Sequence, residues 1–201
     1  MRITAEVKKL TRQRILDSAL TLFRTRGYET TTTRDIADAA EIATGTLFNY
    51  FATKEAIVAC LADQALGKAR AAFARQETSG ELAEQLFAYV AAELRPLKPL
   101  RKFIMPLLET SLSPLAAPPR CDSTDSLRAD HLATVAQLAR KHGLAELSPV
   151  ALQVYWSLYI GVLAFWATDR SPKQEDTLAL LDQSLSMFAR WLQGEPDETP
   201  K

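Results

Sequence analysis

Several features that would point to particular protein classes are scarce or missing in this sequence. It has two cysteines, Cys60 and Cys121, without a Cys-x-x-Cys pair or a Cys/His cluster, so neither a disulfide scaffold nor a metal site is indicated. All ten prolines follow Arg95, and the residues up to that point hold four glycines, which favours long helices there. Lys plus Arg and Asp plus Glu balance at 24 each, so any nucleic-acid binding must come from a local patch.

Enzyme signatures are missing as well. The sequence contains no phosphate-binding glycine-rich loop, no Gly-x-Ser-x-Gly motif and no His-Glu-x-x-His motif. Its histidines, His131 and His142, are too far apart on one helix to share a metal, and we interpret both as surface or capping groups. We therefore expect no catalytic residue, no metal, no cofactor and no enzymatic activity.

One uncharged stretch, from Leu147 to Thr168, is long enough to be a transmembrane candidate. Gln153, Ser157 and two tyrosines lie along it, and no basic flank would orient it in a bilayer. We interpret it as a helix that is buried on nearly all sides. Since the first ten residues also lack the apolar region of a signal peptide, we expect a cytoplasmic protein without membrane contact.

Apolar residues recur at helical spacing, and no segment alternates as a strand would, so the sequence predicts an all-α fold of about nine helices. Thr32 and Asp35 are spaced like a capping box, Thr53 and Ser148 precede helix starts, and Gly143 is typical of a helix end. The predicted helices span residues 6–26, 33–40, 44–50, 54–76, 81–95, 100–112, 124–142, 149–168 and 173–192.

Residues 33–52 carry the most informative pattern. The apolar stripes of its two short helices can be buried only if the helices cross, with Ile42 filling the corner and the small Ala37 allowing close approach. The second helix then turns short, hydrogen-bonding side chains outward, which suit base edges and phosphates in a DNA major groove. These outward residues are Thr44, Thr46, Asn49 and Tyr50. On this pattern alone an ordinary helical hairpin stays open as an alternative.

A longer string extends the pattern through Arg14-Ile15-Leu16, Ala19, Leu22-Phe23, Gly27-Tyr28, Thr31-Thr32-Thr33, Asp35-Ile36-Ala37, Gly45-Thr46-Leu47-Phe48, Tyr50-Phe51 and Lys54-Glu55. Over residues 10–60, in register and without gaps, this string resembles the N-terminal signature of the tetracycline-repressor (TetR) family of transcriptional regulators. The resemblance implies an all-helical homodimer with a helix-turn-helix DNA-binding domain and a ligand-binding, dimerising domain. The domains would be residues 1–53 and 54–194, with 54–76 as a connecting helix and 195–201 as a tail.

The resemblance also implies roles for single residues. Thr33 would contact a phosphate, and Lys54, at a helix start, would clamp another. Gly45 would let the second short helix approach the DNA closely. The implied DNA-binding set is Thr33, Thr44, Gly45, Thr46, Phe48, Asn49, Tyr50 and Lys54. Its partner would be a double-stranded operator, an inverted repeat.

Three residues depart from the family pattern. Glu41 stands in the turn where the family usually has Gly, so a left-handed backbone there would cost roughly 1 kcal/mol or more. Thr44 replaces a common Lys or Arg, and Phe48 replaces a usual Tyr, which removes contacts to phosphates. These departures keep a second function open, a helical protein–protein adaptor whose helix-turn-helix no longer binds DNA.

The C-terminal half carries two stripes that predict a dimer interface. Small residues recur along 149–168, and 173–192 has a heptad-like apolar seam. The predicted interface residues are Ser157, Gly161, Ala164, Leu181, Leu185 and Phe188. Phe87, Phe103, Leu107, Trp156 and Tyr159 are candidates for lining a ligand pocket. For both sets the alternative is the packed core of a single protomer.

The sequence thus predicts a dimeric, sequence-specific DNA-binding regulator. We expect a repressor that an unidentified small-molecule inducer releases from its operator, through a shift between two dimer geometries.

Overall fold

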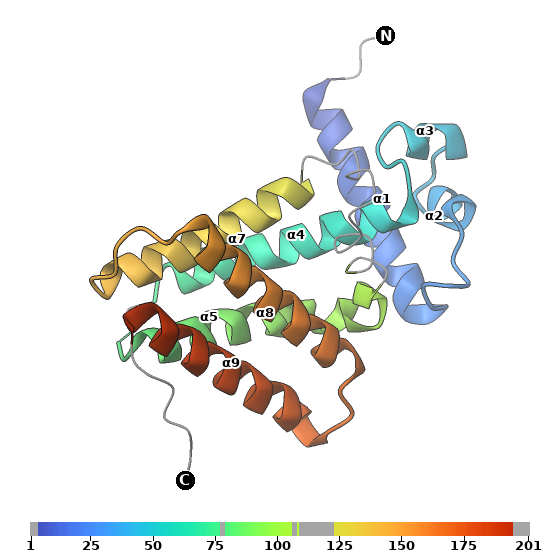
Figure 1. The fold of residues 1–201 in the computed structure, drawn as a ribbon. Helices are drawn as coiled ribbons and strands as arrows, with labels where there is room; N and C mark the ends of the chain where they lie inside the picture. The colour runs from blue at the N-terminus through green and yellow to red at the C-terminus, as the bar shows by residue number, and fades with distance from the viewer. Residues whose placement is uncertain (1–3, 77–78, 106–107, 109–122, 195–201) are drawn as a thin grey trace. The chain divides into compact units, whose positions relative to one another are not determined.

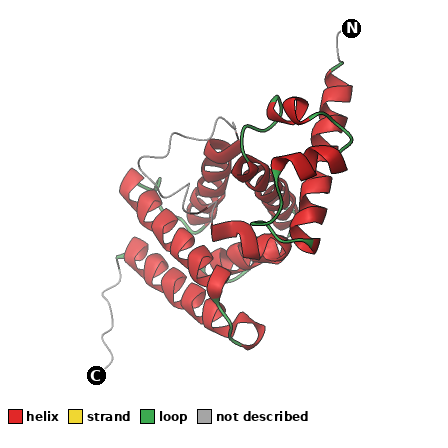
Figure 2. Cartoon of the chain, turned by 90° about the vertical axis from the view of Figure 1, so that its right-hand side faces the viewer, coloured by secondary structure: helices red, strands yellow, loops and turns green. Residues whose placement is uncertain are grey.

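Helices joined by loops make up the described chain (Figures 1 and 2). The computed structural model describes residues 4–76, 79–105, 108 and 123–194. The elements in chain order are α1 (Ala5–Thr25), α2 (Thr33–Ala39), α3 (Thr44–Phe48), α4 (Lys54–Phe73), α5 (Leu82–Leu97), the 3-10 helix η1 (Lys98–Phe103), α7 (Ser123–Lys141), α8 (Pro149–Thr168), the 3-10 helix η2 (Pro172–Gln174) and α9 (Glu175–Gln193). Eight α-helices and no strand in these residues confirm the predicted all-α class.

Short-range sequence signals set several helix ends. The Thr32 hydroxyl accepts from the Asp35 amide at 3.1 Å while the Asp35 carboxylate accepts from the Thr32 amide at 2.8 Å, so the predicted capping box is confirmed. The hydroxyls of Thr53 and Ser148 likewise accept a backbone N–H in the first turns of α4 and α8. Gly143 takes a positive φ of 75° just after α7, as a helix-ending glycine does.

Two predicted helices need correction. The first residues of the predicted 100–112 helix belong to the tighter η1, which spans Lys98–Phe103, and most of the remainder lies outside the described residues. The last helix begins at Glu175, because Gln174 adopts a left-handed backbone with φ of 64°. Ser171 therefore accepts from the Asp176 amide and forms no capping box with Gln174.

The chain divides into two units. Unit 1 comprises Met1–Gln64 and Lys102–Thr124, and unit 2 comprises Ala65–Arg101 and Asp125–Lys201. In unit 1, α1 buries Ile15 and Phe23 together with Ile36 of α2 and Leu47 of α3, each almost without solvent contact. That shared core fixes α1 and the two short helices α2 and α3 around one centre. The predicted domain boundary after residue 53 lies within unit 1 and stays a prediction.

In unit 2, α9 packs against both α5 and α8. Tyr155 and Trp166 of α8 and Leu181 and Phe188 of α9 are fully buried in this core. Helix α8 is the one described helix that is long and apolar enough to cross a membrane, by length and composition alone. Its inward side chains pack on protein, as in a core helix, but its other face is exposed, so the predicted burial on nearly all sides is wrong.

Candidate nucleic-acid interface

The turn between α2 and α3 has the predicted construction. Ala37 and Ala40 of α2 are fully buried, as is Leu47 of α3, and Ile42 in the turn is half-buried. Glu41 has φ of 54°, so the left-handed backbone expected at this position is confirmed, with a glutamate occupying it. The Ile42 amide then donates to the Ala37 carbonyl at 3.0 Å, which closes the turn. The two short helices therefore cross as a helix-turn-helix.

Helix α3 presents its polar face to solvent. Gly45, Phe48 and Asn49 are exposed, whereas the threonines at 44 and 46 and Tyr50 are half-buried. Phe48 is 49% exposed and so is a surface side chain. A Cβ placed on Gly45 would meet no atom within 4 Å, so the protomer itself gives no steric reason for glycine there. Such a helix leaves its outward surface free for a close-fitting partner.

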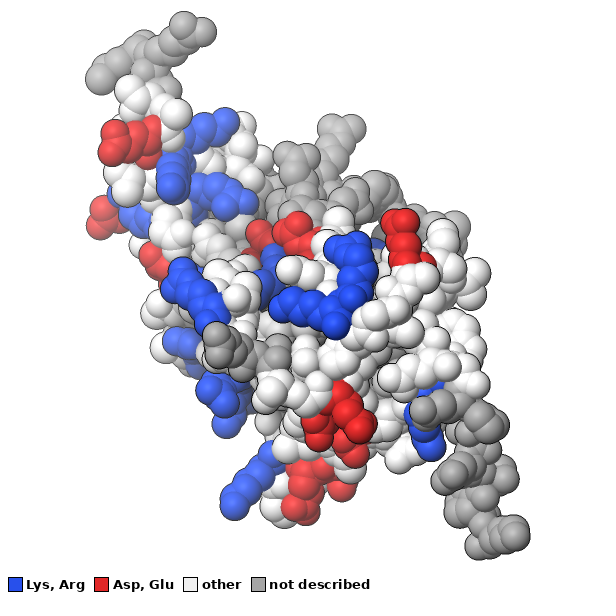
Figure 3. Space-filling view, turned by 90° about the vertical axis from the view of Figure 1, so that its left-hand side faces the viewer, with Lys and Arg blue, Asp and Glu red and all other residues white. Residues whose placement is uncertain are grey.

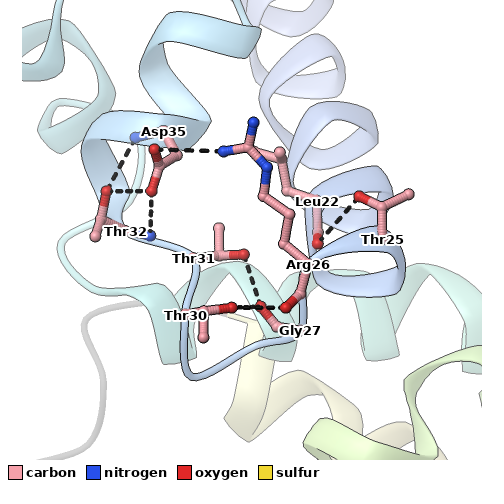
Figure 4. A network of polar contacts seen from close by, with 8 residues as sticks. All are labelled: Leu22, Thr25, Arg26, Gly27, Thr30, Thr31, Thr32 and Asp35. Atoms are coloured by element: carbon pink, nitrogen blue, oxygen red, sulfur yellow. Dashed lines mark hydrogen bonds and ion pairs between the residues drawn. The ribbon is translucent and has the colours of Figure 1, made fainter.

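A threonine-rich loop joins α1 to α2 and is braced from both sides (Figure 4). Thr30 donates to the Arg26 carbonyl at 2.6 Å, and Thr31 donates to the Gly27 carbonyl at 2.7 Å. The Thr32 hydroxyl, which bonds the Asp35 carboxylate, lowers the pKa of that carboxyl. These contacts fix the start of α2, where the half-buried Thr33 is the first helical residue.

Lys54 makes contacts within the protein that the sequence did not predict. Its ammonium donates to the carbonyls of Tyr28 at 2.8 Å and Thr31 at 3.0 Å, and lies 4.1 Å from the centre of the Tyr28 ring. A lysine ammonium has three N–H donors, so these two bonds leave the phosphate contact of Lys54 a prediction. Lys54 holds the threonine-rich loop to the start of α4, and so acts on the interface by positioning it.

Tyr28 and Glu55 form a second tie across the same loop. The Tyr28 hydroxyl donates to Glu55 Oε1 at 2.7 Å. Burial, and then this bond to a carboxylate, raises the pKa of the Tyr28 phenol. Burial opposes ionisation of Glu55, yet the hydrogen bonds from Tyr28 and Thr53 leave the pKa of this carboxyl lowered. The pair therefore stays as a neutral phenol bonded to a carboxylate around neutral pH.

Unit 2 contains a buried polar cluster that the sequence did not reveal. His131 of α7 is 1% exposed and its Nδ1 lies 3.0 Å from an oxygen of Glu93, which is itself fully buried on α5. His131 Nε2 lies 3.2 Å from the Tyr155 hydroxyl, and Tyr159 donates at 3.0 Å to Glu93 Oε2, the same oxygen that lies closest to His131. The prediction that His131 is a surface or capping group is therefore wrong.

The rings around this cluster are tightly packed. The His131 and Tyr159 ring centres are 4.1 Å apart, and Trp156 lies edge-on to His131 at 5.9 Å. Burial, followed by the charge of Glu93, raises the pKa values of Tyr155 and Tyr159 well above the usual phenol range. All of these hydroxyls therefore act as neutral hydrogen-bonding groups.

The predicted pocket residues do not all share one environment. Tyr159 is buried and Trp156 half-buried beside His131 in unit 2. Phe103 is buried in unit 1, where its ring stacks on Tyr28 and tilts against Phe23. That placement corrects Phe103 to a core residue of the N-terminal unit. Phe87 is half-buried on α5, and Leu107 lies outside the described residues.

The predicted dimer residues also separate. Ser157 and Gly161 are exposed and Ala164 is half-buried, so the small-residue stripe of α8 lies on the surface of the protomer. Leu181, Leu185 and Phe188 are 1–3% exposed within the protomer, so the seam of α9 is intramolecular core and that part of the prediction is wrong. The physical reason is that α5 and α8 cover this side of α9. The apolar residues that α8 and α9 do expose are Val150, Val154, Phe165, Leu178, Leu180, Met187 and Trp191.

Comparisons with known proteins match the N-terminal part of the chain by sequence and nearly the whole chain by fold. Residues 15–61 match the family model described as bacterial regulatory proteins, tetR family. Over 47 residues the chain is 53% identical to the HTH-type transcriptional repressor KstR2 of Rhodococcus jostii, covering 23% of this chain and 23% of KstR2. Over 54 residues it is 41% identical to the uncharacterized HTH-type transcriptional regulator YvkB of Bacillus subtilis, covering 27% and 29%. The alignments thus span less than a third of these curated relatives.

Solved structures resemble nearly the whole chain. Thermus thermophilus FadR, described as a TetR family transcriptional repressor in complex with lauroyl-CoA, has a TM-score of 0.67 at 22% identity, over 94% of this chain and 99% of that one. A TetR transcriptional regulator from Rhodococcus sp. RHA1 has a TM-score of 0.72 at 17% identity, over 92% and 97%. At such low identity the likeness demonstrates a common fold.

Proposed function

We propose that the chain is a regulator of the TetR family, namely a dimeric, sequence-specific DNA-binding repressor that a small molecule releases from its operator. The match of residues 15–61 to the tetR family model and the fold shared with TetR structures support this proposal. The observation that carries the proposal is the exposed polar face of α3, with Gly45 and Asn49 in solvent and Thr46 beside them. Short hydroxyl and amide side chains on a helix that leaves its surface open suit base edges in a major groove. No observation on the described residues favours a helical protein–protein adaptor over DNA binding, since an open face alone suits either partner.

A gel-shift titration on the DNA upstream of the protein's own gene tests this proposal. The wild type should form a salt-sensitive complex that prefers this DNA over a mixed-sequence duplex. Thr46→Ala should reduce that preference by about 1 kcal/mol or more, while Thr21→Ala, which alters an exposed threonine of α1, should leave it unchanged. A wild-type protein without any sequence-selective complex would contradict the proposed function.

For the homodimer, we propose that the exposed faces of α8 and α9 meet their symmetry mates. Gly161 lies in the small-residue stripe of α8, where a Cβ would meet nothing within 4 Å, and Val154 and Phe165 flank it as exposed apolar residues. Met187 and Trp191 extend the apolar surface on α9. Two such helices from each protomer would form a four-helix interface, with small residues allowing close approach.

Light scattering after gel filtration tests this interface. The wild type should have about twice the 22.3 kDa mass of the chain. Gly161→Arg should give monomers, because the long side chain would stand where the partner helix approaches. Gly161→Ala is the matched control and should stay dimeric. Equal masses for all three proteins at the mass of one chain would exclude a dimer.

The release step is also a proposal, supported by the FadR structure, whose bound molecule is lauroyl-CoA. Two recognition helices must lie one DNA turn apart, roughly 34–36 Å, to enter successive major grooves. A ligand that binds better to a wider or tilted dimer would shift the population away from that spacing. Lauroyl-CoA is a suitable first probe: it should raise the melting temperature and weaken the DNA complex. We further propose a cytoplasmic protein without enzymatic activity, as the family implies.

A further inference from the structure

The first turns of α1 extend beyond the core of unit 1 (Figures 1 and 2). Ile15 is the first buried residue of the helix, and residues 5–14 are exposed or half-buried. The helix is nevertheless well started, since the Thr4 hydroxyl accepts from the Val7 amide. An exposed segment of almost three turns gains little from its own hydrophobic burial, so its surface chemistry is what distinguishes it.

One face of this segment is basic and lies toward α3. The Arg12 guanidinium lies 5.1 Å from the centre of the Phe51 ring, just after α3. Lys8 and Lys9 stand four and three residues before Arg12, so they extend the same face of the helix by one turn. In Figure 3, Lys and Arg side chains lie on the upper left of the surface, with Asp and Glu side chains beside them. The basic arm, defined as Lys8, Lys9 and Arg12, therefore begins beside the end of α3.

Hydrogen bonds of the Gln13 side chain hold the basic arm in place. Gln64 of α4 donates to the Gln13 amide oxygen at 3.0 Å, and Gln13 itself donates to Asp17 one turn further along α1. The third turn of α1 is thus tied to α4 while Arg12 rests on Phe51. The arm is consequently carried in a fixed direction relative to the helix-turn-helix.

The helix-turn-helix itself supplies little positive charge. Helix α3 has no charged residue, Glu41 places a carboxylate in the adjoining turn, and the Lys54 ammonium binds backbone carbonyls. Helix α2 adds the exposed Arg34. Because affinity for duplex DNA rests largely on Lys and Arg contacts to phosphates, α3 needs cations from a neighbouring element.

We propose that the basic arm binds the sugar–phosphate backbone beside the groove that α3 enters. This inference rests on the proposed DNA-binding function and assigns its electrostatic part to α1. The contact is to phosphate and carries no base preference, so it sets the affinity and the orientation of the domain while α3 reads the sequence.

The test compares Lys8→Gln/Lys9→Gln with the wild type by fluorescence anisotropy across a potassium chloride series. Two labelled duplexes about 30 base pairs long serve as probes, one from upstream of the protein's own gene and one of mixed sequence, each long enough for two half-sites. The double variant should bind both duplexes more weakly by the same factor. Its slope of log affinity against log salt should fall by about 0.9 per lysine in each bound protomer.

Matched variants separate a phosphate contact from net charge. Arg24→Gln/Lys68→Gln removes the same formal charge from exposed positions outside the arm and should keep the wild-type slope. Lys8→Arg/Lys9→Arg keeps both positive charges and should also keep the wild-type slope. The single variants Lys8→Gln and Lys9→Gln should each show half of the change, and they carry the test if the double variant loses helical structure by circular dichroism.

The outcomes distinguish this inference from the function on which it rests. A wild type that binds DNA, with an unchanged salt slope in the Lys8→Gln/Lys9→Gln variant, overturns the basic arm and leaves the proposed function standing. An equal fall in slope for the control pair also overturns it, since net charge would then explain the effect. A wild type without salt-sensitive DNA binding overturns both.

Discussion

His131 Nδ1 lies 3.0 Å from Glu93 Oε2, and neither side chain reaches solvent. Glu93 belongs to α5 and His131 to α7, while Tyr155 and Tyr159 bring α8 into the same hydrogen-bonded group. Three helices are thus joined through polar atoms inside unit 2. A buried carboxylate without its partners would be strongly destabilising, so the geometry of these helices depends on the cluster remaining intact.

Removing the imidazole tests that dependence. His131→Ala should lower the free energy of unfolding by about 3–5 kcal/mol, because Glu93 would stay buried with fewer hydrogen bonds. The double variant Glu93→Leu/His131→Phe should lose much less than the sum of the losses of Glu93→Leu and His131→Phe, since it removes both polar partners together. Urea unfolding of the four proteins in a double-mutant cycle measures the coupling. Additive losses would contradict a coupled pair.

A substitution at Gly45 should affect stability and DNA binding in opposite directions. Gly45→Ala should raise the free energy of unfolding by up to about 1 kcal/mol, because alanine favours a helix and its Cβ meets no atom within the protomer. The same variant should bind operator DNA more weakly, because the methyl group would stand between α3 and the groove. Thermal unfolding and anisotropy on the same samples measure both effects. A variant that is more stable and binds DNA unchanged would remove the close-approach explanation for this glycine.

Glu41 contributes both strain and charge to the turn. Glu41→Gly should remove the strain of a left-handed backbone at a residue with a side chain. We expect the free energy of unfolding to rise by up to about 1 kcal/mol, once the greater freedom of glycine in the unfolded chain is subtracted. Glu41→Gln keeps the strain and removes only the carboxylate. Both variants should strengthen DNA binding at low salt, whereas only the glycine variant should be stabilised. Chemical unfolding and salt-dependent anisotropy distinguish the two contributions.

Local sequence determined much of the N-terminal unit in advance. The burial of Ala37, Ala40 and Leu47 follows from helical spacing, and the positive φ of Glu41 was implied by the family resemblance, since the family usually has Gly at this position. The role of Lys54 was not readable from spacing, since its ammonium bonds carbonyls more than 20 residues away in sequence. Such a contact exists only once α4 has packed against the loop.

The C-terminal unit was less predictable for the same reason. A heptad-like stripe has the same spacing whether it packs within its own protomer or against a partner. The sequence therefore could not show which of the two is contacted by Leu181, Leu185 and Phe188. Glu93 did carry a signal. It continues the apolar stripe of Leu86 and Val90 on α5, and a charged residue in such a stripe indicates a buried partner elsewhere. His131 is that partner.

Asp169 joins the end of α8 to the start of α9 and should make this corner sensitive to acid. Its carboxylate accepts from the Ser171 amide at 2.7 Å and from both the amide and the hydroxyl of Thr177. The Thr177 hydroxyl in particular, together with these amides, holds the pKa of Asp169 well below its usual range. Because the pKa is lower in the folded state, the carboxylate stabilises the fold above the unfolded value of about 4, and this stabilisation is lost as the pH falls below it.

The difference in stability between the wild type and Asp169→Asn should therefore be constant above about pH 5 and should shrink toward lower pH. Thr177→Val, which keeps the shape of a fully buried side chain and removes the hydroxyl donor, should raise the folded-state pKa of Asp169, so the acid-dependent loss of stability should be smaller than in the wild type and should end at a higher pH. Urea unfolding at a series of pH values measures both curves. A wild type and an Asp169→Asn variant whose stabilities run parallel down to pH 3 would show that this carboxylate is no more acidic in the folded chain than in the unfolded one.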